Sequence, residues 1–318
     1  MPAPLRASTS WQPDVWARLQ PVIAAGRSAL DFSDPEVLAV LRAPRPRPGP
    51  AQGVTSTDTT VPSSDGRHEI PVRVYRPDRA DPRRPAFLFL HGGGWTFGDL
   101  DTEHQRCVEL TRRCGAVGVS VGYRLAPEHP ADVLLADCWD AWEWTARRDD
   151  VDPRRIAVTG SSAGGGLALS LAQLARDRDQ LAPMLALAFY PNTDDRALPE
   201  YVSRTTDLPV ITAAQIDQVC RNVGGGRAEP PSYVFPNRTE DLTGLCPTFV
   251  VVAGNDPLRD EALAYATRLV HADVPTELHL LPGVPHAFDL HAPDSASTRT
   301  AYDLMCAAFD RSSAAVPD

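Results

Sequence analysis

The chain has 318 residues, of which 43% are hydrophobic and 23% charged, a composition typical of a globular protein with a sizeable core. Its formal net charge of −10 disfavours nucleic acids and anionic membranes as main partners. All 31 basic residues are Arg. Because a P-loop, a protein kinase, a pyridoxal Schiff base and a Ser-Lys dyad each need a Lys, these mechanisms are excluded.

Helices and then a linker are predicted at the N-terminus. Apolar residues recur at helical spacing between residues 10 and 42, and Ser33-Asp34-Pro35 is a typical helix start within that stretch. Every second residue of 44–50 is Pro, which is incompatible with a helix interior or a central strand. We therefore expect residues 1–50 to contribute helices to a cap and to end in a linker.

Short apolar runs then alternate with helical patterns. The segment 70–75 alternates like a half-buried strand, whereas 86–90 is a continuous apolar run, as expected of a strand covered on both faces. Further strands are predicted at 116–121, 155–159, 185–190, 248–253 and 277–281, with helices at 103–114, 131–147, 163–178 and 257–272. This order predicts an α/β fold with a mostly parallel central sheet flanked by helices.

The segment 195–245 interrupts the alternation. It is rich in Pro and polar residues and contains one predicted helix, at 213–222. We expect it to be an insertion that meets the N-terminal helices and completes the cap. The catalytic domain would then comprise residues 51–194 and 246–318.

One pentapeptide has the spacing of a nucleophilic serine. Gly160-Ser-Ser-Ala-Gly164 matches G-x-S-x-G with Ser162 at its centre, between a predicted strand and a predicted helix. The sharp turn needs small neighbours, and the helix directs its first amides towards a developing oxyanion. Ser161 cannot take this role, because residues 159 and 163 are Thr and Ala. A simple glycine-rich turn is the alternative interpretation.

A second glycine-rich segment, His91-Gly-Gly-Gly-Trp95, follows the buried strand 86–90. Consecutive glycines present backbone N–H groups without side chains in the way, as an oxyanion hole requires. We expect His91 to be structural. The rings of Trp95 and Phe97 follow directly, and we expect them to border a substrate pocket; packing in the core is the alternative for both.

A base and an orienting acid are predicted in later loops. Asp256 follows the strand 248–253, at the end of the strand where sheet enzymes place their sites. Asp260 and Glu261 are interpreted as helix first-turn charges. His286 lies in a loop that leaves the last strand, and His291 is the second candidate for the base. Ser, Asp and His thus occur in the order typical of α/β-hydrolases.

Five motifs together resemble the hormone-sensitive-lipase family of α/β-hydrolases, bacterial esterases that carry an HGGG motif. The resemblance covers roughly residues 65–310 and rests on His91–Trp95, Tyr123–Pro130, Gly160–Gly165, Asp256–Glu261 and His286–Phe288. It implies an α/β-hydrolase fold with a helical cap. It also implies a serine carboxylesterase in which the segment 123–130 supports the glycine loop.

The resemblance assigns a role to individual residues. Ser162 would be the nucleophile, His286 the base and Asp256 the orienting acid. The oxyanion hole would use the amides of Gly93, Gly94 and Ala163, with Gly92 setting the turn. Two features depart from the family: Ser161 stands where relatives usually have Asp, and the helix 213–222 lacks the aromatic cluster common in relatives.

The predicted reaction is hydrolysis of short-acyl or small-molecule esters through an acyl-enzyme, without metal or cofactor. Two other classes stay open: a dedicated deacetylase, acyltransferase or dehydratase, and a non-catalytic small-molecule binder on the same scaffold. Six scattered cysteines without a C-x-x-C pair argue against a disulfide scaffold and a structural zinc site. With no signal peptide or long apolar run, we expect a cytoplasmic protein; a homodimer is compatible with the sequence.

Overall fold

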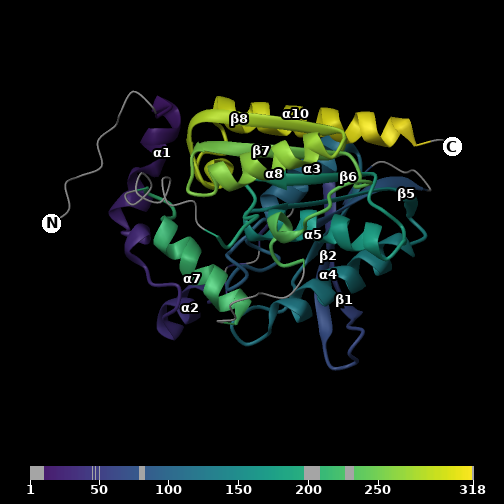
Figure 1. Ribbon diagram of the computed structural model, residues 1–318, viewed down its shortest axis with the longest axis horizontal. Helices are drawn as coiled ribbons and strands as arrows, with labels where there is room; N and C mark the ends of the chain where they lie inside the picture. Colours follow the sequence, from purple (N-terminus) through teal and green to yellow (C-terminus); the bar gives the residue numbers. More distant parts are fainter. Residues whose placement is uncertain are drawn as a thin grey trace.

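An eight-stranded sheet runs through the chain in the order β1-β2-β4-β3-β5-β6-β7-β8 (Figure 1). The computed structural model describes residues 11–44, 46, 48–49, 51–78, 83–196, 208–225 and 233–316. β1 pairs with β2 and β2 with β4 in antiparallel fashion, whereas all later pairs are parallel. The predicted fold class, an α/β fold with a mostly parallel sheet, is confirmed.

The strands are β1 (Val54–Pro62), β2 (Glu69–Pro77), β3 (Arg84–Leu90), β4 (Val117–Val121), β5 (Val151–Ser161), β6 (Leu185–Phe189), β7 (Thr248–Asn255) and β8 (Thr276–Pro285). The helices are α1 (Pro13–Ala24), α2 (Pro35–Leu41), α3 (His104–Cys114), α4 (Ala131–Ala146), α5 (Ala163–Asp177), α7 (Ala213–Gly224), α8 (Arg259–His271), α9 (Phe288–His291) and α10 (Ala296–Ala315). Two short 3₁₀ turns lie at Arg27–Ala29 and Pro236–Arg238.

The sheet is covered on both faces because its central strands are apolar on both. In β3, Leu88 and Leu90 join the core that α4 and α5 cover, whereas Phe87 and Phe89 join the core that α3 and α10 cover. This follows from the alternation of side chains along a strand. A continuous apolar run is therefore needed for a central parallel strand, as the sequence predicts for this one.

The sequence analysis missed two of the longer elements, β1 and α10, and the short helix α9. β1 is an edge strand in which only Val54 and Val61 are buried, so it shows no alternating apolar pattern. The second is α10, whose buried residues Ala301, Met305 and Ala308 do recur at helical spacing. The small side chains of Ala301 and Ala308, and the Ser and Thr residues towards both ends of the helix, weaken that pattern.

The N-terminal segment and the insertion meet at one end of the sheet. Gln215 on α7 donates to the backbone carbonyls of Arg27 and Leu30, at 2.9 Å each, and Asn222 donates to the carbonyl of Phe32 at 2.9 Å. In Figure 1, α2 and α7 lie side by side at this end. Residues 1–10, 45, 47 and 50 of the predicted N-terminal unit, and 197–207 and 226–232 of the insertion, lie outside the described residues.

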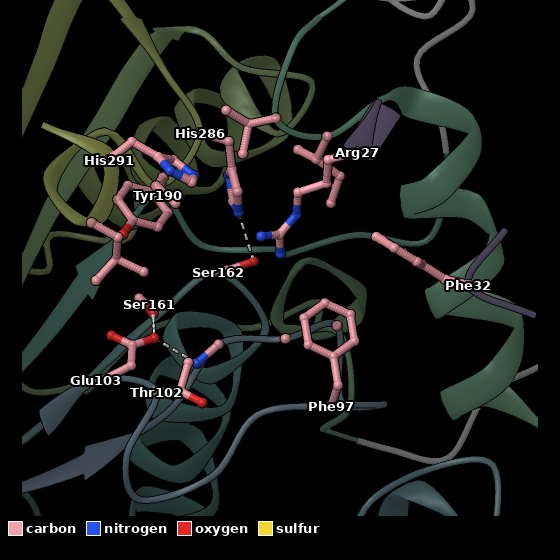
Figure 2. Close-up of a pocket in the computed structure, with 17 residues that line it drawn as sticks. Arg27, Phe32, Phe97, Thr102, Glu103, Ser161, Ser162, Tyr190, His286 and His291 are labelled. Carbon is pink, nitrogen blue, oxygen red and sulfur yellow. Dashed lines mark hydrogen bonds between the residues drawn. The ribbon is translucent and has the colours of Figure 1, made fainter. Parts of the chain in front are cut away.

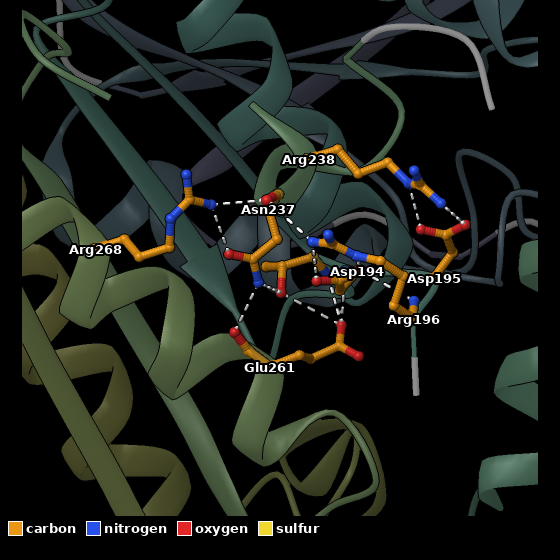
Figure 3. A network of polar contacts seen from close by, with 8 residues as sticks. Asp194, Asp195, Arg196, Asn237, Arg238, Glu261 and Arg268 are labelled. Carbon is orange, nitrogen blue, oxygen red and sulfur yellow. Dashed lines mark hydrogen bonds and ion pairs between the residues drawn. The ribbon is translucent and has the colours of Figure 1, made fainter. Parts of the chain in front are cut away.

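A polar network fixes the ends of the insertion to α8 (Figure 3). Arg238 pairs with Asp195 at 2.6 Å, and Arg268 on α8 donates to the backbone carbonyl of Asn237 at 2.7 Å. Glu261, predicted as a helix first-turn charge, also accepts backbone N–H groups from the loop after β6. Arg238 therefore pairs with a carboxylate, whereas Arg268 donates to backbone carbonyls.

The longest helix, α10, has 20 residues, enough in length to cross a bilayer. Its Ser, Thr, Asp and Arg side chains make such a crossing unfavourable. Within the described ranges, no helix combines the length and the apolar character that a membrane span requires.

Candidate active site

Ser162 lies on a strained turn between β5 and α5. Its backbone has φ 53° and ψ −123°, a combination that L-residues rarely adopt. The flanking glycines make the turn possible, because a Cβ at Gly160 would lie 2.3 Å from the carbonyl oxygen of Gly164. A Cβ at Gly164 would lie 2.0 Å from the carbonyl oxygen of Leu90. The G-x-S-x-G spacing thus has a steric cause in this chain.

Ser162, His286 and Asp256 form a continuous hydrogen-bonded line. The Nε2 atom of His286 lies 2.9 Å from the Ser162 hydroxyl, and its Nδ1 atom lies 2.7 Å from an Asp256 carboxylate oxygen. The carboxylate can only accept, so Nδ1 carries the proton and Nε2 is free to accept from the serine hydroxyl. Asp256 is fully buried, and its second oxygen accepts the backbone N–H of Leu258 at 2.9 Å.

The parallel sheet explains why three residues so far apart in sequence meet. Ser162 follows β5, Asp256 follows β7 and His286 follows β8, so all three lie beyond the carboxyl ends of parallel strands. β6 separates β5 from β7, and the carbonyl of its last residue, Phe189, accepts the Ser162 N–H at 2.9 Å. Sheet enzymes place their sites at this edge.

The glycine loop after β3 lies beside Ser162 because β3 is the neighbour of β5, with Leu90 opposite Gly160. Gly93 and Gly94 have φ values of 118° and 58°, and both line the same cavity as Ser162. In the part of the chain that the structure describes, their amides donate to no protein acceptor, whereas the Gly92 amide donates to Glu103 at 2.9 Å. Ala163, at the start of α5, presents a helix N-terminal amide.

The segment Tyr123–Pro130 contacts this loop, as expected of a support. The Tyr123 hydroxyl donates to the backbone carbonyl of His91 at 2.7 Å, and the Ala126 amide donates to that of Trp95 at 2.9 Å. The His91 ring stacks on Tyr123, with ring centroids 4.2 Å apart. Burial lowers the pKa of His91 to about 4, so this histidine is neutral at neutral pH and packs as a structural residue.

A cavity of about 310 Å³ opens above Ser162 (Figure 2). Its apolar walls come from four parts of the chain and include Phe32, Phe97, Val210, Ile211 and Leu290. The Arg27 side chain reaches into the same space from the N-terminal segment, as Figure 2 shows. Residues from both predicted parts of the cap therefore border the space in front of the serine.

Of the two rings predicted to border the pocket, the structure places only one there. Phe97 lines the cavity and packs edge-on against Phe32, with centroids 5.3 Å apart. Trp95 is fully buried and packs edge-on against Phe235, away from the cavity lining. For Trp95, the structure shows the alternative of core packing, because its side chain is fully buried in the hydrophobic core.

The second candidate base, His291, also lines the cavity but makes no hydrogen bond to Ser162. Burial and the nearby Arg27 guanidinium lower the pKa of His291 to about 4. Among the described histidines, only His286 contacts both the serine and a carboxylate.

A buried ionic network beneath the site was missed by the sequence analysis. The Ser161 hydroxyl and the Gly92 amide both donate to the same carboxylate oxygen of Glu103. The other oxygen pairs with Arg106, which is fully buried. The Arg106 guanidinium also pairs with an Asp289 carboxylate oxygen at 2.6 Å. The network thus joins the glycine loop, the serine turn and the helix after His286. In the sequence, Ser161 stands out only as unsuited to the role of nucleophile and as a departure from the family, and its partner Glu103 lies 58 residues away.

Restoring the family residue at position 161 is expected to be harmful in this chain. In Ser161→Asp, a second carboxylate would contact Glu103 where neither side chain is more than 2% exposed, and two such groups cannot both ionise. We expect kcat/KM to fall by about tenfold or more, with a lower Tm. Kinetics on a small ester and thermal melting would measure both changes.

Two further variants isolate the charge effect. Ser161→Ala removes the hydroxyl without adding charge, so it should lower kcat/KM and Tm by less than Ser161→Asp does. In Ser161→Asp/Glu103→Gln, the amide can donate to the new carboxylate and should recover much of the loss. A Ser161→Asp protein with the activity and Tm of the parent chain would contradict this account of Glu103.

Comparison with known proteins identifies the family. A family model described as an α/β hydrolase fold matches residues 87–290. The chain belongs to this family of α/β hydrolases. The family resemblance inferred from the five motifs is thereby confirmed.

Several relatives of this α/β hydrolase are named as esterases or ester hydrolases. Esterase LipI of Mycobacterium tuberculosis is 39% identical over 229 residues, covering 69% of this chain and 71% of LipI. The ethyl acetate hydrolase of Pseudomonas putida is 34% identical over 303 residues, covering 88% of this chain and 92% of that enzyme. The crystal structure of esterase LipW from Mycobacterium marinum matches with a TM-score of 0.81 and 32% identity, covering 96% of this chain and 97% of the LipW chain. These relatives place the chain among the ester hydrolases.

Proposed function

We propose that the chain is a serine carboxylesterase with Ser162 as nucleophile, His286 as base and Asp256 as orienting acid. The observation that carries the proposal is the unbroken line of two hydrogen bonds from Asp256 through His286 to Ser162, at the floor of a cavity. Removal of the hydroxyl proton by Nε2 creates a positive imidazolium, which the buried carboxylate stabilises.

The proposed reaction has two halves. His286 removes the proton of Ser162 as the hydroxyl oxygen attacks the ester carbonyl, and the protonated ring then donates to the leaving alcohol. Water activated by the same ring releases the acid from the acyl-enzyme. The negative oxygen formed in each half would be held by the backbone amides of Gly93, Gly94 and Ala163.

We propose that the substrates are esters of small acids. The cavity of about 310 Å³ is at the lower end of the range for small-molecule sites, and its walls are largely apolar. Residues 1–50 and 195–245 would form a cap that limits its size, supported by the contacts between α7 and residues 27–32. The Phe97 ring would border the acyl group.

A series of p-nitrophenyl esters with linear acyl chains tests this function. Each methylene adds about 0.8 kcal/mol of burial while it has room, and beyond that length it clashes or stays in water. We therefore expect kcat/KM to peak at about two to six acyl carbons and then to fall. A steady rise to long-chain esters, with activation at a lipid interface, would contradict the small-pocket proposal. Absence of turnover across the whole series would contradict the esterase proposal.

A further inference from the structure

Two of the six cysteines are in direct contact at the junction of two helices. Cys114 is the last residue of α3, and Cys306 lies on α10, 192 residues later in the chain. Their Sγ atoms are 3.2 Å apart. Among the described residues, no other pair of cysteines is in sulfur contact.

The helices that carry the two thiols are held together by other contacts. Arg113, next to Cys114, pairs with Asp303 on α10 at 2.6 Å. The same guanidinium lies over the Tyr302 ring, 5.6 Å from its centroid. Both Cys114 and Cys306 are partly exposed. The pair is thus prepositioned by the fold and is not enclosed in the core.

We propose that Cys114 and Cys306 form an intramolecular disulfide when the protein meets a low-molecular-weight disulfide such as glutathione disulfide. A disulfide has an S–S bond of about 2.05 Å, so the two sulfur atoms, 3.2 Å apart, need to approach by about 1 Å for closure. This modification site is separate from the catalytic residues and from the proposed esterase function.

The chemistry is a pair of thiol–disulfide exchanges. The thiolate of one cysteine attacks a sulfur of glutathione disulfide, forms a mixed disulfide and releases one glutathione. The second cysteine, as thiolate, attacks the protein sulfur of the mixed disulfide, and the second glutathione leaves. Two protein thiols are oxidised, one glutathione disulfide is reduced to two glutathione molecules, and the protein loses two hydrogen atoms.

The surroundings indicate a slow reaction. The hydrogen bond with Cys306 and burial raise the pKa of the Cys114 thiol, and Asp310 acts in the same direction, whereas the Arg113 guanidinium opposes them. The thiolate is the attacking species, so its low population slows the first exchange. Exposure to the oxidant is therefore carried out for hours rather than minutes.

The bond would change stability more than catalysis. It would close a loop across most of the chain, which restricts the unfolded state most strongly for long loops. Tyr302, one helical turn before Cys306, donates to Asp289 at 3.3 Å, so the bond would also anchor the helix that supports the network beneath His286. We expect a higher Tm and an unchanged kcat at ambient temperature.

In the test, the fully reduced, purified chain is exposed to glutathione disulfide, and the glutathione is then removed. Three quantities are measured: the intact mass, the number of free thiols and the Tm. We expect a loss of two hydrogen atoms, a fall from six thiols to four, and a Tm increase of about 5 °C or more. Peptide mapping of the oxidised parent chain should identify a crosslink between Cys114 and Cys306, which needs no variant.

Matched variants complete the design. Cys306→Ser should give neither the crosslink nor the rise in Tm, and it should accept at most one glutathione at Cys114. Cys246→Ser, which removes a cysteine elsewhere in the fold, should form the same crosslink with the same rise in Tm, while its free thiols fall from five to three. Six thiols after prolonged exposure, or a crosslink between other cysteines, would overturn the proposal. An unchanged Tm in the crosslinked parent chain would overturn the expected stabilisation.

Discussion

Replacing Ser162 by Ala is expected to lower kcat by about 10⁴-fold or more, with little loss of stability. The hydroxyl lies at the cavity floor and its hydrogen bond is to His286, so its removal leaves the core unchanged. His286→Ala should lower kcat by a comparable factor. Asp256→Asn should lower kcat by the same factor or less, because it disturbs the tautomer and the alignment of the His286 ring. Steady-state kinetics with thermal melting of each variant measures both effects.

His291→Ala is the matched control for these variants. It removes a histidine that lines the same cavity but makes no contact with the Ser162 hydroxyl. We expect this variant to keep activity within about tenfold of the parent chain. Near-normal rates in His286→Ala together with loss in His291→Ala would transfer the role of base to His291.

Adding a methyl group at Gly93 is expected to lower kcat by about 10²-fold or more, with a smaller change in KM. A Cβ there would lie 2.0 Å from the backbone carbonyl oxygen of Phe97, and φ is 118°. Because the obstacle is backbone, the loop must move, and its amide moves with it. Comparing kcat and KM on one small ester separates the two contributions.

Gly94→Ala offers a comparison with a different obstacle. Its φ of 58° is accessible at modest cost, and the new Cβ would lie 2.5 Å from the side chain of Val219 on α7. We expect a loss of activity that Val219→Ala partly restores, whereas Gly93→Ala should not be restored in this way. An increase in KM alone for Gly93→Ala would instead indicate a substrate-binding wall.

Much of the fold follows from the sequence because central parallel strands are apolar on both faces. The run 86–90 shows this signal, and the structure extends it to Arg84–Leu90. β1 lacks the signal because an exposed edge strand does not need it. Domain boundaries, a cytoplasmic location and a homodimer stay predictions.

The site was predictable where the chemistry depends on local spacing. Ser162, Asp256 and His286 each follow a strand, and parallel strands bring such positions to one edge. Trp95 and Glu103 show the limit of that reasoning. The Trp95 ring packs against Phe235 of the insertion, and the partner of Glu103 lies in another motif. Neither property is encoded in a local pattern.

The most direct test of the account is labelling with a fluorophosphonate, which reacts with an activated serine. Intact mass and peptide mapping would follow the parent chain, Ser162→Ala and Ser161→Ala. We expect one adduct per chain, on Ser162. The adduct should be absent in Ser162→Ala and present in Ser161→Ala, and ester hydrolysis should be lost in proportion to labelling. An unlabelled parent chain that still hydrolyses esters, or an adduct on another residue that abolishes activity, would contradict it.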